Sequence, residues 1–589
     1  MSEDLFRFTS GPRNARILLV GEAWGESEAR SARPFCGYSG HELDRMLAEA
    51  GLDRSTILCT NVISEHPPFN DFTHFLVPIK EAKHVKPYHG FFPRPALASS
   101  IDRLWRLIAT VNPDLIVTAG NWPFHVLTSC TSTSTSAGHK LPTGITTWRG
   151  SQTWCRNEEL ERARATIGSS TKGSIPVLPV IHPAAITRQW YLRSVTVHDL
   201  RSRAMRFTKG LLDWNEPALL ATARPSFSEV MRDLNHWIAR ASHAPFRLSV
   251  DIETYARSFI TCIGLGDETY RLCIPFFYFD NEGVNIPFWT IEEELAIWLR
   301  LKHLLELPLL EIVGQNFMYD TIFLARYGIR AIAKHDTQVM HHLLYPGTPK
   351  ALHYISSLYC NYYCYWKDES EEWAAGTLSA SDLWSYNNKD IAYTLECCET
   401  LLGLIKLRKY EDHLSWRMRE WQLARKMALR GIRDDTALRA KYRLDLMHQA
   451  TALQDYLITT VPECWRWGGK GVPWFNSPKA TMDMLYEGIG IPPIAHKKTK
   501  RPTVDDAALE ALIANKKHRW LEPLLSRLQA LRSLNVFRSH FIDIKLGPAG
   551  RLYTQFTINH PETFRWASSA NPFDEGTNTQ NFPKVSIDD

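Results

Sequence analysis

The chain has 589 residues, of which 44% are hydrophobic and 22% are charged, and its formal net charge at pH 7 is +5. A single core does not organise a chain of this length, so we expect roughly three or four globular domains and not a disordered chain. No apolar stretch approaches the roughly 18 residues of a membrane helix, and residues 1–6 lack the apolar core of a secretory signal. These features predict a cytoplasmic protein, in the host cytoplasm if viral, with no membrane partner.

In the first third of the chain, predicted strands alternate with predicted helices. The strands are expected at 16–20, 56–60, 114–118 and 175–181, and the helices at 26–30, 41–50 and 99–111. Polar residues follow three of these strands: Glu22 after the break at Gly21, and Asn61 and His182 directly. The alternation predicts a parallel sheet with a functional cleft along the carboxyl ends of its strands.

Five short stretches in this region, taken in order, resemble the uracil-DNA glycosylase superfamily and especially its family 4 branch. They are GEAWGESE at 21–28, RPF at 33–35, TNV at 60–62, WRG at 148–150 and IHP at 181–183. The resemblance covers about residues 14–205 and implies an α/β/α fold that removes a damaged base. It implies that Phe35 stacks on a flipped base and that Asn61 reads the edge of that base. It also implies that His182 hydrogen-bonds the anion developing on the departing base and that Glu22 positions or activates water.

Three features depart from the family 4 pattern. The cysteines of this region lie outside the spacing that holds an iron–sulfur cluster, so no cluster is expected: Cys36, Cys59, Cys130 and Cys155. Trp24 stands where the family has a smaller proline, and residues 131–138 form a polar insertion that we expect to be a flexible loop. Two interpretations stay open, an active glycosylase and a glycosylase fold kept for DNA binding or docking.

The middle of the chain carries a set of acidic residues. A predicted strand from Phe246 leads to Asp251 and Glu253, whose two-residue spacing puts both carboxylates on one face. Acids that share a face are typical of a divalent-metal site. Two later pairs, each four residues apart and therefore expected on one helix face, are Asn316 with Asp320 and Tyr386 with Asp390. The set suits hydrolysis of a phosphodiester by two metal ions about 3.5–4 Å apart.

These residues resemble the 3′→5′ proofreading exonuclease domain of family A DNA polymerases, of the type whose last motif is Y-x-x-x-D. The resemblance covers about residues 241–409 and implies an RNase H-like fold with a mixed sheet. It implies that two divalent ions, Mg²⁺ or Mn²⁺, are held by Asp251, Glu253, Asp320 and Asp390. It further implies that Tyr386 orients the attacking water and that Asn316 contacts single-stranded 3′ ends of DNA.

The last third resembles the thumb of family A polymerases. The matching stretches are FNSP at 475–478, a predicted helix at 479–487 and a basic tip at 497–501. Contact with the phosphate backbone is expected for Lys497 and Lys498, although a solvated charge run is the alternative. A predicted strand at 550–556 and the segments 563–572 and 578–583 resemble a primer–template contact. By that resemblance the DNA-binding residues are Arg565, Ser568, Ser569, Asn571, Gln580 and Asn581.

The predicted fold class is α/β multidomain, with a glycosylase-like α/β/α parallel sheet, an RNase H-like exonuclease and a helical thumb. The boundaries are 1–206 for the glycosylase-like domain, 207–245 for a connector, 246–409 for the exonuclease, and 410–589 for the thumb and the start of a palm. The palm's catalytic motifs and the fingers are not recognisable, so we expect no polymerase activity from this chain alone.

We therefore expect a DNA replication or repair protein with a proofreading exonuclease and a possible uracil-excision domain. A second polypeptide is expected to supply the palm and fingers of a family A polymerase. Two alternatives stay open: a stand-alone repair nuclease and glycosylase, and a non-catalytic protein that holds primer–template for a partner.

Overall fold

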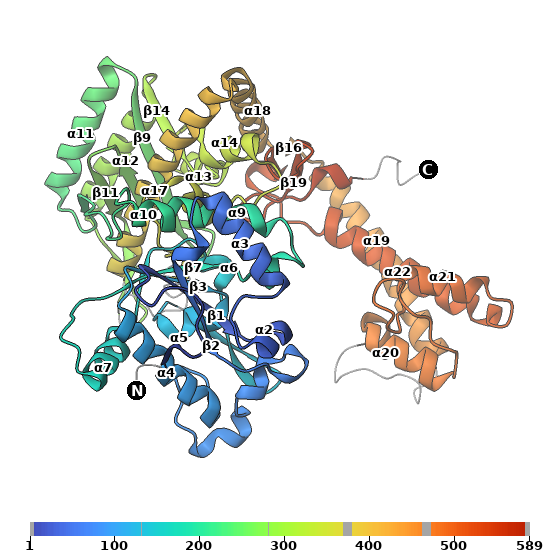
Figure 1. The fold of residues 1–589 in the computed structure, drawn as a ribbon. Coiled ribbons are helices and arrows are strands. Elements are labelled where there is room, and N and C mark those ends of the chain that lie inside the picture. Colours follow the sequence, from blue (N-terminus) through green and yellow to red (C-terminus); the bar gives the residue numbers. More distant parts are fainter. Residues whose placement is uncertain (1–4, 131, 281, 369–379, 462–472, 583–589) are drawn as a thin grey trace. The chain divides into compact units, whose positions relative to one another are not determined.

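A computed structural model describes residues 5–130, 132–280, 282–368, 380–461 and 473–582, and Figure 1 traces their elements. The chain divides into two compact units, one of Met1–Asp320 with Tyr327–Met418 and one of Thr321–Arg326 with Arg419–Asp589. None of the helices in the described ranges combines the length and apolar character that a bilayer crossing needs.

The first unit contains a five-stranded sheet in the order β2-β1-β3-β7-β6. Its strands are β1 (Ile17–Ala23), β2 (Ile57–Ile63), β3 (Leu115–Ala119), β7 (Pro176–Val180) and the short antiparallel edge β6 (Thr153–Trp154). The other four are parallel, as the sequence predicts. Their near-continuous apolar runs follow from burial on both faces of the sheet.

Helices cover both faces of this sheet and close two cores. On one face lie α4 (Pro95–Val111) and α7 (Asn157–Ile167), and α4 contributes Leu104 and Trp105 to the core. On the other face lie α3 (Tyr38–Ala50) and α9 (Leu192–Asp199), and α3 contributes Leu43 and Met46. Shorter helices sit where strands end: α2 (Glu26–Ser31), α5 (Asn121–Leu127), α6 (Ile145–Trp148) and α8 (Pro183–Ile186).

The flexible loop predicted around 131–138 is wrong for its described part. Residues Ser132–Ser136 form β4, which pairs antiparallel with β5 (His139–Thr143). The two turn residues, Ala137 and Gly138, both have positive φ angles of 47° and 78°. A two-residue turn of this kind matches the twist of a hairpin, and the alternating Thr residues favour strands.

A second, six-stranded sheet in the same unit has the order β15-β14-β9-β10-β11-β8. The strands are β8 (Ala221–Thr222), β9 (Phe246–Tyr255), β10 (Phe259–Gly266), β11 (Arg271–Pro275), β14 (Leu310–Gly314) and β15 (Ala333–Asp336). Pairing is antiparallel between β9, β10 and β11 and parallel between β9, β14 and β15, so the sheet is mixed. Two elements from the predicted connector join this region, the edge strand β8 and the helix α11 (Phe227–His243).

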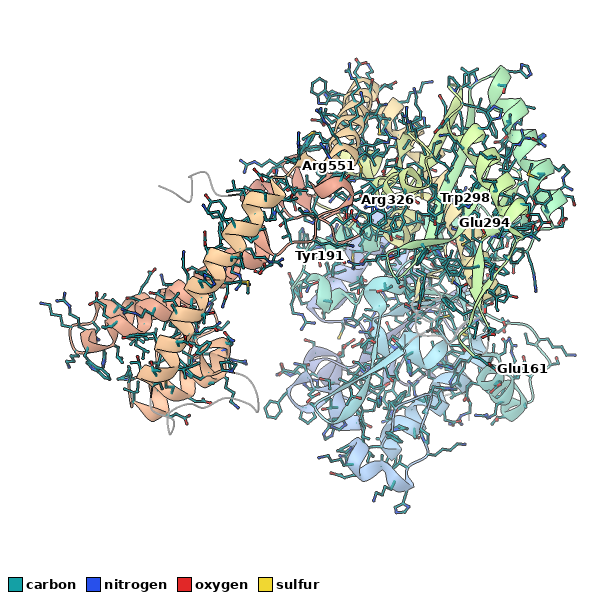
Figure 2. All side chains as sticks on the ribbon, turned by 180° about the vertical axis from the view of Figure 1, so that it is seen from behind. Glu161, Tyr191, Glu294, Trp298, Arg326 and Arg551 are labelled. Atoms are coloured by element: carbon teal, nitrogen blue, oxygen red, sulfur yellow. The ribbon has the colours of Figure 1, made fainter. Side chains whose placement is uncertain are left out.

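Helix α17 (Ala380–Leu407) lies directly on this second sheet. Both Gly264 and Gly266 of β10 face it, and an added Cβ on Gly266 would stand 2.5 Å from Ile391. The remaining helices are α12 (Ile291–Leu305), α13 (Met318–Arg326), α14 (Thr337–Leu344) and α15 (Leu352–Tyr359). On α12 the Trp298 indole N–H donates to Glu294 at 3.2 Å, and both side chains are marked in Figure 2.

The second unit is mainly helical around its own apolar core. Its helices include α19 (Thr436–Thr460), α20 (Pro478–Met482), α21 (Asp506–Ala514) and α22 (Glu522–Phe537). Helix α18 (Glu411–Arg430) ends at Gly431, whose φ of 60° suits a helix C-cap. Arg551, marked in Figure 2, donates to the Arg430 carbonyl at 2.7 Å.

The single strand predicted at 550–556 is wrong, because the structure has two short strands there. Strand β17 (Arg551–Leu552) pairs with β16 (Ile432–Arg433), whereas β18 (Gln555–Thr557) pairs with β19 (Ala567–Ser569). Different partners on each side of Tyr553 interrupt the ladder. The chain also passes very close to Gly576 at this point, where any Cβ would clash with the Tyr553 carbonyl.

Candidate functional sites

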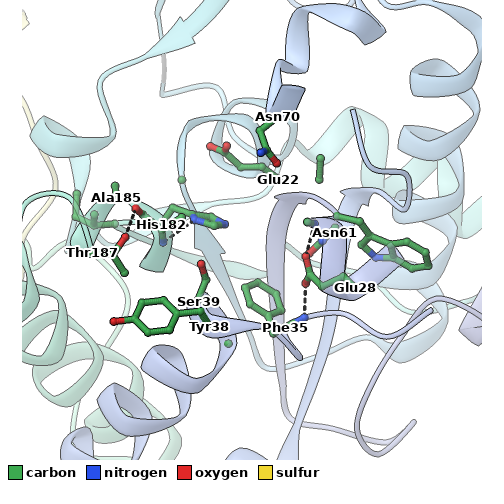
Figure 3. A pocket seen from close by; sticks show the side chains of 18 of the residues that line it. Glu22, Glu28, Phe35, Tyr38, Ser39, Asn61, Asn70, His182, Ala185 and Thr187 are labelled. Carbon is green, nitrogen blue, oxygen red and sulfur yellow. Dashed lines mark hydrogen bonds between the residues drawn. The ribbon is translucent and has the colours of Figure 1, made fainter. Parts of the chain in front are cut away.

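A pocket of about 850 Å³ opens at the carboxyl ends of the first sheet's strands. Glu22 comes from the end of β1, Asn61 from β2 and His182 from the residue after β7. Phe35 joins them from the segment between α2 and α3, so all four residues predicted for this site line one pocket (Figure 3). Parallel strands explain this, since their carboxyl ends meet along one edge.

Phe35 is held in an unusual backbone conformation beside Asn61. Its φ angle is 55°, and its backbone N–H donates to the Glu28 carboxylate. The other oxygen of Glu28 accepts from the Gly25 N–H at 2.6 Å, so one carboxylate joins two segments of the pocket wall. Glu28 lies inside the GEAWGESE stretch, but its contact with the Phe35 backbone depends on the path of the loop, which residue spacing does not predict.

The backbone of Gly21 lies against both the Phe35 ring and the Asn61 side-chain amide. A Cβ on this residue would stand 2.7 Å from the Phe35 ring and 2.5 Å from Asn61 Oδ1. Both distances are shorter than ordinary contacts, so only glycine lets these two side chains occupy this part of the pocket.

The Asn61 amide oxygen is buried and, among the described residues, unpaired. Asn61 is only 1% exposed, and its Oδ1 has no hydrogen-bond partner within the described structure. Leaving a buried acceptor unpaired costs about 1–3 kcal/mol. A planar ligand with a matching donor would remove that penalty, and the Watson–Crick edge of a base carries such donors.

His182 has a defined hydrogen-bonding pattern. It is the N-cap of α8, and its Nδ1 accepts from the Ala184 N–H at 3.1 Å. Because Nδ1 is the acceptor, the neutral imidazole carries its proton on Nε2. His182 can therefore offer an N–H donor in the pocket, and its ring centroid lies 6.4 Å from that of Phe35.

Glu22 and Trp24 shape the remaining wall. Gly120, with a φ of +100°, leaves the space that the Glu22 carboxylate fills, since a Cβ there would clash with Glu22 Oε1. Trp24 is 6% exposed and lines the pocket. Its indole N–H has no hydrogen-bond partner within the described structure.

The four cysteines of this region are buried or partly buried thiols. Burial raises the pKa of Cys59 to about 12 and that of Cys130 to about 11. Thiols with raised pKa values stay protonated and are poor metal ligands. The expectation that this region holds no iron–sulfur cluster remains a prediction.

A second site lies on the mixed sheet. Asp251 and Glu253 extend from β9, and Asp390 comes from α17. Each offers a carboxylate oxygen, and these oxygens all lie within 4.8 Å of one another, which makes the three residues the one potential metal-binding group found among the described residues. Oxygen donors at this spacing fit a hard divalent cation such as Mg²⁺ or Mn²⁺.

The electrostatics of this group favour a bound cation. Burial raises the pKa of Asp251 to about 7, and the charge of Asp390 adds to the effect. Burial and then the charge of Asp251 raise the pKa of Glu253 well above its usual range. Like charges crowded in a low dielectric repel each other, and a divalent cation between them would relieve that repulsion.

Asp320 stands beside this group. Its Oδ1 accepts from the Ile252 N–H at 3.0 Å, which fastens α13 to the strand between the two acids of β9. Burial, and after it the charge of Asp251, raises the pKa of Asp320. Asp320 is not within the three-residue group, although it contacts the strand that carries two of its members.

Tyr386 and Asp390 lie on one face of α17, as their spacing predicts. Lys367 joins them, because its Nζ donates to Tyr386 Oη at 2.5 Å and contacts Asp390 Oδ2. The Trp366 indole N–H donates to Asp390 Oδ1 at 2.6 Å. Sequence reasoning missed Trp366 and Lys367, since no periodic pattern tells where a loop returns to a site.

The prediction that Asn316 shares a helix face with Asp320 is wrong. Helix α13 begins at Met318, and Asn316 precedes it with a φ of 55°. The Asn316 N–H donates to Asp336 Oδ1 at 3.2 Å, and the Phe317 N–H donates to the other oxygen at 2.9 Å. Asp336 therefore fixes the turn that leads into α13, and the Asn316 side chain is exposed.

The residues predicted to contact DNA in the second unit fall into two groups. Lys497 and Lys498 are exposed, and so are Arg565, Ser569, Gln580 and Asn581. Ser568 and Asn571 are buried, and they bond within the segment. Ser568 donates to Asn578 Oδ1 at 2.5 Å, and the Asn571 amide donates to Glu575 at 3.0 Å.

Comparison with known proteins identifies the two domains in which these sites lie. Residues 8–202 match the uracil DNA glycosylase superfamily, and residues 229–406 match a 3′-5′ exonuclease family found in family A DNA polymerases. The type-4 uracil-DNA glycosylase of Sulfurisphaera tokodaii is 44% identical over 61 residues, which are 10% of this chain and 28% of that protein. That of Thermotoga maritima is 40% identical over 60 residues, 10% of this chain and 31% of that protein.

Two longer likenesses involve polymerases. The DNA polymerase of Bacillus phage SP01 is 24% identical over 368 residues, which are 57% of this chain and 33% of that protein. The POL domain of Pol1 from M. smegmatis, in complex with DNA primer-template and dNTP, has a TM-score of 0.42 and 19% identity, covering 60% of this chain and 55% of that one. The chain thus spans about a third or less of each curated relative.

Exonuclease domains of the matched kind use divalent metals, in agreement with the acidic group on β9 and α17. The chain therefore carries a uracil-DNA glycosylase superfamily domain at its amino terminus, followed by a 3′-5′ exonuclease domain of the family A DNA polymerase type.

Proposed function

We propose that the chain hydrolyses DNA from single-stranded 3′ ends at the site formed by Asp251, Glu253, Asp320 and Asp390. The observation that carries this is the trio of carboxylates whose oxygens lie within 4.8 Å of one another. Two bound divalent cations, Mg²⁺ or Mn²⁺, would supply an activated water and neutralise charge on the leaving oxygen.

The chain's own residues prepare this site. The Asn387 amide donates to Asp251 Oδ2 at 2.8 Å and so fixes the direction of that carboxylate. The Tyr386 hydroxyl has its position set by Lys367, and in this proposal it orients the attacking water. Exposed Asn316 is proposed to contact the strand near the scissile phosphate.

The test is a single-stranded oligonucleotide labelled at its 5′ end and incubated with Mg²⁺ or Mn²⁺. We expect a ladder of products shortened from the 3′ end, which Asp251→Ala abolishes. Glu268→Ala is the matched control, because this acid is 64% exposed on the turn after β10 and lies outside the site. A ladder that survives Asp251→Ala would contradict the assignment.

We further propose that the amino-terminal domain excises uracil from DNA in this pocket, because uracil is the base in the name of the matched glycosylase family. Phe35 would stack on the flipped base, Asn61 would pair with its edge, and His182 Nε2 would donate to the oxygen that gains charge. Glu22 would position water against the sugar carbon. The unpaired Asn61 oxygen in a closely packed pocket supports this role.

This activity is measured with an oligonucleotide that carries one central uracil, without divalent metal so that the exonuclease is silent. Alkali then breaks the strand wherever a base has been removed. We expect breaks with the unaltered chain and none with Asn61→Ala. If neither protein excises uracil but both bind the oligonucleotide equally, the domain is a docking or DNA-binding fold.

The second unit is proposed to hold primer–template, with the exposed residues Arg565, Ser569, Gln580 and Asn581 on the primer side and the basic tip on the backbone. The buried Ser568 and Asn571 would hold that segment in shape. Two exposed lysines at that tip should each release about one counterion on binding. We expect Lys497→Ala with Lys498→Ala to lower the slope of log affinity against log salt by about two, whereas Lys516→Ala with Lys517→Ala does not.

We also propose that a second polypeptide carries the palm and fingers that work with these residues. Tagged chain recovered from its natural source should bring down a palm-bearing partner and extend a primer. A chain that extends primers by itself would contradict that part and leave the exonuclease assignment intact.

A further inference from the structure

Residues 360–367 connect the amino-terminal domain to the acidic group on the second sheet, and we call them the bridge segment. The bridge segment follows α15, crosses to the amino-terminal domain and returns to the acidic group on the second sheet. It has no regular secondary structure, so its backbone groups depend on other parts of the chain for hydrogen bonds.

The amino-terminal domain supplies those bonds through two adjacent residues, Ser151 and Gln152. The Gln152 N–H donates to the Tyr363 carbonyl at 2.7 Å, and the Tyr363 N–H donates back to Gln152 Oε1 at 3.2 Å. The Tyr365 N–H donates to Ser151 Oγ at 3.1 Å. Both anchoring residues are buried, with exposures of 1% or less.

Two arginines of the same domain fix the start of the bridge segment. Arg203 donates to the carbonyls of Cys360 at 2.9 Å and Asn361 at 2.6 Å, beyond the carboxyl end of α15. Arg149 pairs with buried Asp199 and also donates to Ser357 Oγ in the last turn of α15 at 3.0 Å. Arg149 belongs to the WRG stretch, which none of the proposed catalytic roles uses.

The other end of the bridge segment reaches the acidic group. Trp366 is buried, lies against Tyr393 of α17 at a centroid distance of 4.3 Å, and donates to Asp390 Oδ1. Lys367 follows it, and its ammonium contacts both Asp390 Oδ2 and the Tyr386 hydroxyl. Trp366 directly follows the Tyr365 anchor and Lys367 is the next residue, so holding Tyr365 limits where the ammonium can lie.

We propose that Lys367 is a positioning residue of the exonuclease, and that Ser151 and Gln152 of the glycosylase domain act through the bridge segment to place it. The inference rests on the proposed exonuclease site. Lys367 holds the carboxylate of Asp390 and the hydroxyl of Tyr386 in one arrangement. Through the bridge segment, the glycosylase domain thereby helps to position the side chains of the exonuclease site.

The charge of Lys367 gives the proposal a second readout. A cation beside Asp390 repels a divalent ion at the same carboxylate, because like charges in a poorly screened site interact strongly. Removing the charge should tighten metal binding and at the same time release Asp390 and Tyr386. A merely structural defect would instead weaken both metal binding and cleavage.

The experiment compares Lys367→Met and Lys367→Arg with the unaltered chain. We expect Lys367→Met to bind Mn²⁺ at least about threefold more tightly by calorimetry and to cleave with kcat at least about tenfold lower. KM for the oligonucleotide should change by less than about twofold, and Lys367→Arg should restore most of kcat. Unchanged kcat, or weaker Mn²⁺ binding, would overturn the inference.

The interdomain step is tested by Ser151→Ala with Gln152→Ala, with exposed Thr110→Ala of the same domain as control. We expect the pair to lower kcat about fivefold and Thr110→Ala to leave it unchanged. Added to Lys367→Met, the pair should lower kcat by less than about twofold more, because both act through one ammonium. Full additivity would overturn the coupling.

Failure of the underlying assignment is distinguishable from failure of this inference. An unaltered chain that yields no 3′ ladder and binds no Mn²⁺ removes the proposed exonuclease itself. A normal ladder with a Lys367→Met variant that matches it removes only the role of Lys367. If Ser151→Ala with Gln152→Ala does not fold, Gln152→Glu keeps the acceptor for the Tyr363 N–H and takes its place in the comparison.

Discussion

The imidazole of His182 accepts a hydrogen bond at Nδ1 from the backbone N–H of Ala184, 3.1 Å away. This bond caps a short helix and also decides which ring nitrogen carries the proton. A structural contact therefore leaves Nε2 as a donor in the pocket. The same arrangement allows the two roles to be separated by substitution.

His182→Asn should keep the cap and remove the donor, because an asparagine oxygen also accepts N–H groups at a helix start. We expect uracil excision to fall about 10²–10³-fold, as when one donor to a developing anion is lost. Thermal unfolding should be almost unchanged, and so should the exonuclease ladder. Full excision by His182→Asn would show that another group stabilises the departing base.

The acidic group predicts how stability depends on pH when metal is removed. The folded pKa of Asp251 is about 7, above its unfolded value of about 3.9, so the folded state binds the extra proton. The stability from this group is complete below about pH 4 and is lost as pH rises through 7. Burial is the largest influence on the pKa of this carboxyl and raises it, as does the charge of Asp390, whereas Lys367 and the Asn387 hydrogen bond lower it.

In the presence of EDTA, the midpoint of thermal unfolding should therefore fall between pH 5 and pH 8. Adding Mn²⁺ at pH 8 should restore it, since ligand that binds only the folded chain stabilises it. Asp251→Asn removes the titrating group and should weaken both effects. A midpoint that rises with pH in EDTA, equally in both proteins, would contradict the origin assigned here.

Close contact between α17 and the sheet leads to a third prediction. A Cβ on Gly264 would clash with the amide oxygen of Asn387, whose nitrogen holds Asp251. Gly264→Ala should destabilise the fold by about 1–3 kcal/mol and reduce cleavage more than tenfold. Gly403 lies on α17 with open space around it, so Gly403→Ala should instead stabilise the fold by about 0.5–1 kcal/mol. Chemical denaturation and the ladder assay measure both.

The residues that the sequence predicts well are those whose positions follow from regular geometry. Asn61 and His182 come together because parallel strands end at one edge, and Tyr386 and Asp390 because four residues make about one helical turn. Asn316 fails because a left-handed residue precedes α13, which a spacing of four does not reveal. The sequence does not predict the position of Lys367, because the bridge segment that carries this residue has no periodic pattern. Tertiary contacts, here with Ser151 and Gln152, decide such positions.

The last prediction concerns Phe69, whose side chain is 100% exposed beside the glycosylase pocket. Its neighbours Pro67 and Asn70 line that pocket, and Phe69 itself has a φ of 57° that turns the segment. Because its chain neighbours line the proposed base-binding pocket, we expect this fully exposed phenyl ring to stack on a neighbouring base of the strand. Stacking of this kind is worth about 1–3 kcal/mol per base.

Phe69→Ala should therefore weaken binding of a uracil-containing single strand by roughly five- to a hundredfold, with an unchanged unfolding midpoint. Phe69→Trp should retain or strengthen binding, because the larger ring still stacks. Ile291→Ala, which removes an apolar side chain that is 84% exposed on α12, is the control and should not alter binding. Equal affinities for Phe69→Ala and the unaltered chain, measured by fluorescence anisotropy, would mean that the strand passes the pocket on another side.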